Sequence, residues 1–152
     1  MTNRKIAPLQ LYHIYNRSVL KIPLFKCAAD YDRFKLKIVH YKKLYPVKIL
    51  AYCLMPNHFH FLIREPENPL SEKISNSSKF LQNLQNAYAK YFAIKYKHSG
   101  RVFQGVFKSK RIDSDAYLNE IVRYIHENPV RKKLVATPKD WPYSSARYLI
   151  NL

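Results

Sequence analysis

Two histidines, His58 and His60, stand one residue apart inside an apolar run of the sequence. If this run is a β-strand, side chains alternate between its two faces, so both imidazoles share one face and Phe59 and Phe61 the other. Their attachment points are then about 6.6 Å apart, from a rise of about 3.3 Å per residue. Neutral imidazole is a common metal ligand, and this spacing lets two rings converge on one ion. An ordinary half-exposed strand can carry the same pattern, so the spacing alone leaves both interpretations open.

The charge balance indicates a polyanionic partner. The 152 residues include 27 Lys and Arg against 10 Asp and Glu, which gives a net charge of +17. Such an imbalance opposes compaction by self-repulsion, and it favours nucleic acid as the partner ahead of an anionic membrane. Thirteen Tyr and eight Phe accompany the cations. Aromatic rings offer stacking surfaces to the bases of single-stranded nucleic acid, although we expect most of them to fill the core.

Length and cysteine content favour a single domain in a reducing compartment. We expect one domain over residues 1–152, because a chain of this size with 47% hydrophobic residues can bury a real core. Cys27 and Cys53 do not form a Cys-x-x-Cys pair, which is typical of a reduced, cytoplasmic protein. The first residues lack the apolar stretch of a signal peptide. No window approaches 18 uncharged apolar residues, so we expect no membrane association.

The elements that must position the histidines follow from hydrophobic periodicity. Loose apolar alternation predicts a first strand over residues 9–17, and His13 within it is expected to be structural. Residues 47–54 are dense enough in apolar side chains to form a central strand. A Pro-Asn turn then returns the chain as the histidine strand, residues 57–64, so we expect these two strands to form an antiparallel hairpin.

Capping signals and proline place the helices. Asn68 followed by Pro69 is a favoured helix start, and Gly100 is a favoured residue just beyond a helix end. Pro129 restricts Asn128 to non-helical backbone, which is expected to end the last helix. Together with apolar residues at helical spacing, these signals predict helices over residues 30–45, 68–100 and 114–128.

Residues 100–111, GRVFQGVFKSKR, contain both glycines of the chain among several basic residues. Glycine favours tight bends and the close approach of another backbone. A glycine-bent basic hairpin is therefore suited to hold a phosphate backbone, and an ordinary solvated hairpin is the alternative. The cations of this segment that we expect to contact DNA are Arg101, Lys108, Lys110 and Arg111.

Three separated motifs resemble one family when taken together. They are MPNHFH at 55–60, GRVFQG with FKSK at 100–110, and YIHENPVR at 124–131. In this order they resemble the single-strand DNA tyrosine transposases of the His-hydrophobic-His (HUH) superfamily, and WPYSS at 141–145 fits the REP-associated branch. The resemblance implies an α+β, ferredoxin-like (RRM-like) fold. In that fold a central antiparallel sheet is backed by helices and carries the histidines on a middle strand.

The resemblance also implies roles for individual residues. His58 and His60 would bind a divalent metal, Mg²⁺ or Mn²⁺, and Tyr124 matches the nucleophile. Asn128 matches the third metal ligand and would lie one helical turn from Tyr124, which ties the nucleophile's helix to the metal. Tyr117, seven residues earlier on a similar side, is the rival nucleophile.

The implied activity is cleavage and rejoining of single-stranded DNA near hairpins through a 5′-phosphotyrosine intermediate. The expected partner is single-stranded DNA with hairpins, bound by a cytoplasmic, nucleoid-associated protein, and Arg131 is a further expected DNA contact. Monomer and homodimer both stay open. Many relatives carry an arginine where Val106 stands, so one phosphate contact is missing.

Two alternatives stay open beside this activity. A domesticated repeat-associated endonuclease or host factor would keep the same site. A non-catalytic single-stranded nucleic-acid-binding protein would explain the charge and the aromatic residues. It gives no reason for two histidines and a distant tyrosine to meet.

Overall fold

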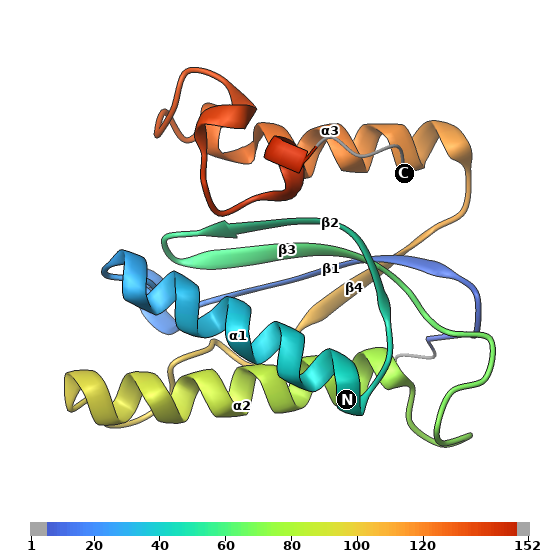
Figure 1. Cartoon of the computed structure of the whole chain (residues 1–152), viewed down its shortest axis with the longest axis horizontal. Helices are drawn as coiled ribbons and strands as arrows, with labels where there is room; N and C mark the ends of the chain where they lie inside the picture. Colours follow the sequence, from blue (N-terminus) through green and yellow to red (C-terminus); the bar gives the residue numbers. More distant parts are fainter. Residues whose placement is uncertain (1–5, 149–152) are drawn as a thin grey trace.

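The computed structural model describes residues 6–148 and shows one antiparallel sheet between two layers of helices (Figure 1). The strand order is β2-β3-β1-β4, so the histidine strand β3 is an inner strand, and the predicted α+β fold is confirmed. Helices α1 and α2 cover one face of the sheet and α3 covers the other. The elements are β1 (Leu11–Arg17), α1 (Ala28–Leu44), β2 (Lys48–Met55), β3 (His58–Arg64), α2 (Asn76–Tyr96), β4 (Lys108–Ile112) and α3 (Asp115–Arg131).

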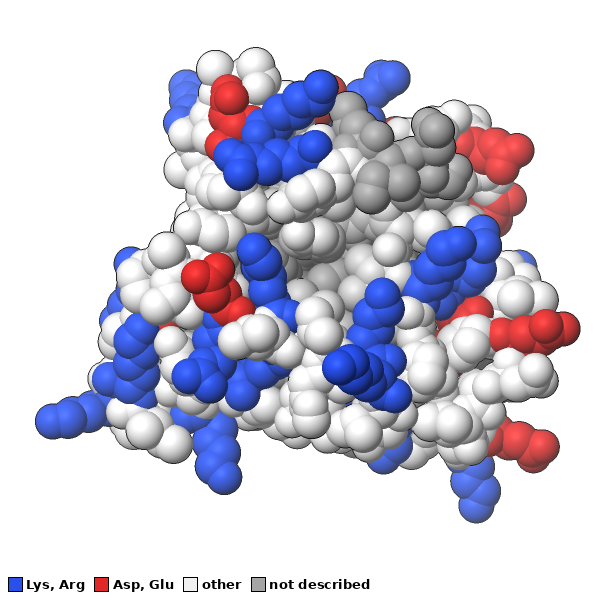
Figure 2. Space-filling model, in the orientation of Figure 1, with Lys and Arg blue, Asp and Glu red and all other residues white. Residues whose placement is uncertain are grey.

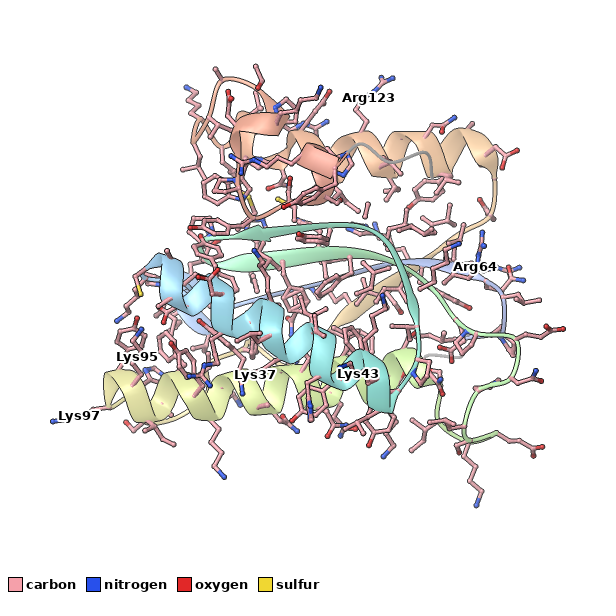
Figure 3. All side chains as sticks on the ribbon, viewed as in Figure 1. Lys37, Lys43, Arg64, Lys95, Lys97 and Arg123 are labelled. Carbon is pink, nitrogen blue, oxygen red and sulfur yellow. The ribbon has the colours of Figure 1, made fainter. Side chains whose placement is uncertain are left out.

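Basic side chains project from every layer of the molecule. On the face shown in Figure 2, Lys and Arg are spread over the surface with few acidic groups between them. Figure 3 shows Lys37 and Lys43 on α1, Arg64 at the end of β3 and Arg123 on the opposite layer. The positive charge is therefore spread over several elements rather than confined to one.

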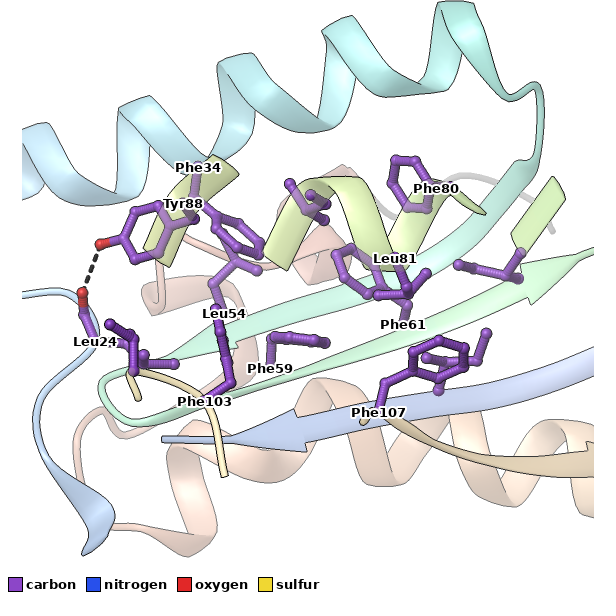
Figure 4. Close-up of a cluster of buried hydrophobic side chains, with 14 of the residues drawn as sticks. Leu24, Phe34, Leu54, Phe59, Phe61, Phe80, Leu81, Tyr88, Phe103 and Phe107 are labelled. Carbon is purple, nitrogen blue, oxygen red and sulfur yellow. Dashed lines mark hydrogen bonds between the residues drawn. The ribbon is translucent and has the colours of Figure 1, made fainter. Parts of the chain in front are cut away.

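The core lies mainly between the sheet and the pair α1 and α2. Phe59 and Phe61 of β3 are fully buried there, together with Phe34 of α1 and Tyr88 of α2 (Figure 4). The hydroxyl of Tyr88 donates a hydrogen bond to the carbonyl oxygen of Leu24, so this buried polar group has its partner. Because side chains alternate along a strand, burying the two phenylalanines on this face turns both histidines towards α3.

Helix α2 begins later than predicted, at Asn76 instead of Asn68. Its N-cap is Ser75, whose hydroxyl accepts the amide of the residue three positions on. The carboxylate of Glu65, at the end of β3, accepts the amides of Asn76 and Ser77 at 2.8 and 2.9 Å. These acceptors satisfy the free amides of the first helical turn. The helix therefore starts where Glu65, which follows β3, can accept hydrogen bonds from it.

Both helix ends that were predicted from glycine and proline are wrong. Helix α2 ends before Lys97, which takes the left-handed backbone (φ 50°) that Gly100 was expected to supply. Helix α3 continues past Asn128 and through Pro129 to Arg131. Pro129 has no amide hydrogen to donate and its ring crowds the carbonyl four residues earlier. Helical bonding nevertheless continues beyond it, with the Lys132 amide donating to the Asn128 carbonyl at 3.1 Å.

Strand β2 is an edge strand, which corrects the central position predicted from its apolar density. A C-terminal segment covers the exposed edge. The amide of Leu54 donates to the carbonyl of Tyr143 at 2.8 Å, and the amide of Tyr52 donates to the hydroxyl of Ser145 at 2.9 Å. Trp141 adds a hydrogen bond from its indole nitrogen to the carbonyl of Leu54, so the edge is largely satisfied.

The basic segment does not form a hairpin, contrary to the prediction. Residues 100–107 are irregular, and only β4 forms beyond them, paired with β1. Backbone hydrogen bonds from this segment go to the end of β1 and the loop after it. Gln104 donates to Arg17 at 3.0 Å, and Val102 accepts from Val19 at 2.8 Å. The segment is thereby held against the end of the sheet where β3 begins.

Two further predictions concern the cysteines and membrane association. Neither cysteine forms a disulfide; Cys53 is buried and Cys27 is exposed. Within residues 6–148, no helix combines the length and the apolar character that crossing a bilayer requires.

Candidate active site

A cavity of about 590 Å³ opens where β3 begins and α3 ends. Its lining includes His58 and His60 from β3 together with Tyr124 and Asn128 from α3. The packing of α3 on the sheet brings these residues together from segments more than sixty positions apart in the chain. Tyr117 lines a neighbouring hollow on the other side of Tyr124 and does not line this cavity.

His58 has an oxygen atom facing each of its ring nitrogens. Nδ1 lies 2.7 Å from Oδ1 of Asn57, and Nε2 lies 3.2 Å from Oδ1 of Asn128. Burial lowers the pKa of His58, as does nearby Lys132, although the Asn128 contact raises it, so the ring is neutral at pH 7. A neutral imidazole has one N–H and can donate to only one of these oxygens. With the proton on Nδ1, the Nε2 lone pair faces the amide oxygen of Asn128.

His60 is held from both sides. Its Nδ1 lies 2.9 Å from Nε2 of His13, and its Nε2 lies 3.4 Å from the amide nitrogen of Asn128. Burial, followed by the proximity of His58 and His13, holds the pKa of His60 well below its usual value. Because the amide nitrogen can only donate, Nε2 of His60 is the acceptor and Nδ1 carries the proton towards His13.

The residues at this point fit a divalent cation. The Nε2 atoms of both histidines face the amide of Asn128: that of His58 lies 3.2 Å from its oxygen, and that of His60 lies 3.4 Å from its nitrogen. An amide binds a cation through its oxygen, so only the first of these distances joins two potential ligand atoms. Neighbouring ligands of one ion are about 3 Å apart when the metal–ligand distance is about 2.1 Å and the angle near 90°. Among residues 6–148 no group of three or more His, Cys, Asp or Glu is arranged to hold a metal, so a cation bound here would use the amide oxygen of Asn128 beside the two imidazoles. The three donors are uncharged and would leave the ion its full positive field.

Tyr124 stands beside this donor set. Its ring meets the His60 ring edge to face, with centroids 5.5 Å apart, and the Arg131 guanidinium lies over the Tyr124 ring, 4.9 Å from its centroid. The ring is half-buried and lines the cavity, while Asn128 follows one helical turn later. The helix that carries the phenol thus also carries the amide that faces the histidines.

The five predicted DNA contacts lie in different places. Lys108 lines the cavity, and Lys110 and Arg131 line the neighbouring hollow with Tyr124. Arg101 borders a separate groove between α2 and the segment that follows it. The side chain of Arg111 lies on the other face of β4, away from the histidines. Arg111 pairs with Tyr12 of β1, which packs towards α1 and α2, and paired residues share a face of the sheet.

Sequence reasoning left out several residues that line the cavity or support it. Arg17, Lys21 and Lys132 contribute three more cations to the lining. Arg17 ends β1 opposite His58, and Lys21 lies in the turn that follows β1. His13 was expected to be structural, yet it contacts His60; the signal is its diagonal position across the β1–β3 pair. His126 points elsewhere and lies 2.7 Å from the hydroxyl of Ser145.

This combination of fold and site agrees with a comparison against known families. Residues 8–128 match the family model described as "Transposase IS200 like", which covers more than half of the chain. The chain therefore belongs to the IS200-like transposase family, as the motifs predicted.

The relatives add detail within that family. The chain is 34% identical over 106 residues to a Haemophilus influenzae protein described as a REP-associated tyrosine transposase, which is 66% of this chain and 60% of that protein's length. The fold is shared with a REP-associated tyrosine transposase bound to a REP hairpin, with a TM-score of 0.78, 19% identity and coverage of 97% and 83% of the two chains. A transposase structure from Deinococcus radiodurans R1 matches with a TM-score of 0.52, 16% identity and coverage of 84% and 96%.

Proposed function

We propose that this protein is a metal-dependent transposase that cleaves and rejoins single-stranded DNA near hairpins, with Tyr124 as the nucleophile. One observation carries the proposal: the phenol of Tyr124 shares a cavity with His58, His60 and Asn128, and the amide of Asn128 faces Nε2 of both histidines. A passive nucleic-acid-binding surface has no need for that convergence.

Substrate binding is assigned to the cations of the cavity wall. These are Arg17, Lys21, Lys108 and Lys132, and no Asp or Glu is among the described residues that line the cavity. A phosphate entering here meets only positive and neutral groups, which favours the DNA backbone without selecting its sequence. Support for a hairpin-bearing substrate comes from the similar transposase that was solved with a REP hairpin.

The chemical step is a transfer of the phosphoryl link from DNA to tyrosine. The Tyr124 oxygen attacks phosphorus, loses its proton and forms a 5′-phosphotyrosine bond, while the bond to the 3′ oxygen breaks and that oxygen takes up a proton. A phenol is a weak nucleophile at neutral pH. A divalent cation held by His58, His60 and Asn128 would polarise the phosphate and neutralise developing charge. The covalent link conserves the phosphodiester energy, so another 3′-OH can rejoin the strand without ATP.

Tyr124→Phe tests the nucleophile. In the presence of Mn²⁺, a hairpin oligonucleotide with single-stranded flanks should give a covalent protein–DNA adduct with the native protein. The variant should lose at least about 100-fold of adduct yield, because nothing replaces the attacking oxygen. Oligonucleotide binding should stay within about twofold, since the phenylalanine ring keeps the packing against His60.

Tyr117→Phe is the matched control, because Tyr117 lies on the same helix and outside the cavity. It should form adducts at the native yield. Adducts of undiminished yield from Tyr124→Phe would rule out this nucleophile, and binding without adducts from the native protein would favour the non-catalytic alternative.

A further inference from the structure

Leu20 combines two unfavourable features. It lies in a short 3₁₀ turn (Val19–Lys21), and its side chain is 90% exposed. Its backbone has φ 50° and that of Lys21 has φ 57°, so two consecutive residues with a Cβ adopt left-handed backbone. That conformation is disfavoured for such residues, and an exposed leucine gains nothing from burial. Neither packing nor local conformation explains a leucine at this position.

The loop that carries Leu20 is nevertheless firmly attached. The amide of Ser18 donates to the carbonyl of Asn57 at 2.9 Å, and the amide of Leu24 donates to the carbonyl of Pro56 at 2.7 Å. Both acceptors belong to the turn immediately before His58. The leucine is therefore presented to solvent from a fixed place next to the histidine strand.

That place is the rim of the catalytic cavity. The next residue, Lys21, lines the cavity, and so does Val106, whose side chain is 72% exposed. The other charged groups of the lining are all cationic, and no carboxylate is found among its described residues. Leu20 thus directly precedes a residue of the lining, and the exposed apolar side chain of Val106 belongs to the same basic cavity, which we assign to DNA.

We propose that Leu20 is a wedge that contacts the last base pair of a DNA hairpin, where the stem opens into single strand. The inference rests on the proposed function. Apolar side chains placed at a base step unstack it, and the contacts that the redirected strand makes with the protein offset the cost. The released strand can then enter the cavity beside Lys21 and reach Tyr124.

Nucleic acid fits this rim better than a second copy of the chain does. A second copy would bring a net charge of +17 towards the cations of the lining. DNA supplies the opposite charge in its phosphates and an apolar surface in its stacked bases.

The test measures unstacking without cleavage, on the Tyr124→Phe background. The DNA is a hairpin with a single-stranded flank that carries 2-aminopurine at the first unpaired position. Binding should raise the probe's fluorescence, because unstacking relieves its quenching. Leu20→Ala should remove most of that rise and weaken binding of the flanked hairpin about five- to tenfold, with unchanged affinity for an unstructured single strand.

Two controls separate the wedge from folding effects. Leu20→Asn also removes the apolar contact but tolerates left-handed backbone, so it should lose the signal while its thermal midpoint equals or exceeds that of the parent. Leu36→Ala changes a leucine that is 65% exposed on α1 and should keep the full signal.

Unaltered fluorescence and affinity in Leu20→Ala would overturn the proposal. So would a change in sedimentation behaviour with no change in DNA binding, which would assign the leucine to self-association. Because no cleavage is measured, failure of the wedge and failure of Tyr124 as nucleophile give different results.

Discussion

His13 supports the site at the scale of single residues. Its Nε2 lies 2.9 Å from Nδ1 of His60, and the two rings are stacked with centroids 5.2 Å apart. Burial, with a further contribution from Lys110, lowers the pKa of His13 to about 4. The ring is therefore neutral, and its Nε2 can accept a hydrogen bond from the N–H of His60. This contact fixes the proton of His60 on Nδ1 and leaves Nε2 with its lone pair towards Asn128. Hydrogen-bond partners outside a metal site commonly fix the tautomer of a histidine ligand in this way.

Replacing His13 should therefore weaken metal binding without removing a ligand. His13→Leu loses the acceptor, and we expect Mn²⁺ affinity, measured by electron paramagnetic resonance titration, to fall about 10- to 100-fold. His13→Gln retains a hydrogen-bond acceptor and should recover part of the loss. His58→Ala removes a proposed ligand and should abolish binding at the same site. Equal Mn²⁺ affinity in His13→Leu and the native protein would contradict the positioning role.

Individual residues were predicted to different extents. His58, His60 and Asn128 could be placed from the sequence because a strand and a helix have fixed periodicities and the motifs resemble a family. His13 could not, because its contact with His60 depends on the register of β1 against β3. Arg111 was grouped with Lys108 and Lys110 by sequence proximity, whereas strand alternation places it on the other face.

At the scale of elements, a buried carboxylate links α1 to α2. Asp30 of α1 accepts hydrogen bonds from the Lys95 ammonium at 2.7 Å and the Tyr91 hydroxyl at 2.8 Å, and also from the Tyr96 hydroxyl and the Lys26 amide. Burial alone would raise the pKa of Asp30, but these hydrogen bonds, led by that of Lys95, lower it to about 2. The folded protein therefore holds this carboxylate ionised more strongly than the unfolded chain does.

Asp30→Asn should make the protein less stable and less sensitive to acid. Because the folded-state pKa is depressed, the contribution of Asp30 is present above about pH 4 and is lost as the pH falls towards 2. We expect urea unfolding at pH 7 to show a loss of about 2 kcal/mol in the free energy of unfolding. Asp32→Asn, at an exposed position of the same helix, is the control and should change little. A native-like urea midpoint for Asp30→Asn at pH 7 would contradict the role of this group.

Element types were easier to predict than element limits. The β2–β3 hairpin and the existence of all three helices followed from apolar periodicity. The start of α2 did not, because Glu65 at the end of β3 supplies acceptors to its first turn. The edge position of β2 was also missed, since one of its apolar faces packs on α3 and the other on the layer of α1 and α2. The start of α2 and the position of β2 in the sheet both depend on contacts with segments that are distant in the sequence.

For the whole molecule, the net charge of +17 predicts strongly salt-dependent DNA binding. Four cations line the cavity, while others, such as Lys43 on α1, lie elsewhere on the surface (Figure 3). Lys108→Gln should reduce the slope of log Kd against log salt by about 0.7 to 0.9, because each phosphate contact releases condensed counterions. Lys43→Gln should leave the slope nearly unchanged. Anisotropy titrations on the Tyr124→Phe background measure this, and equal slopes for both variants would assign binding to diffuse charge.

The residues that we propose as catalytic belong to two bodies: the sheet supplies the imidazoles, and one helix supplies both the phenol and the amide. Ile121 and Ile125, on the buried side of that helix, set how it rests on the sheet. A small tilt of α3 would therefore move the phenol of Tyr124 and the amide of Asn128 together, relative to both histidines. If the proposed activity holds, its turnover should therefore depend on the shape of apolar side chains that never meet the nucleic acid.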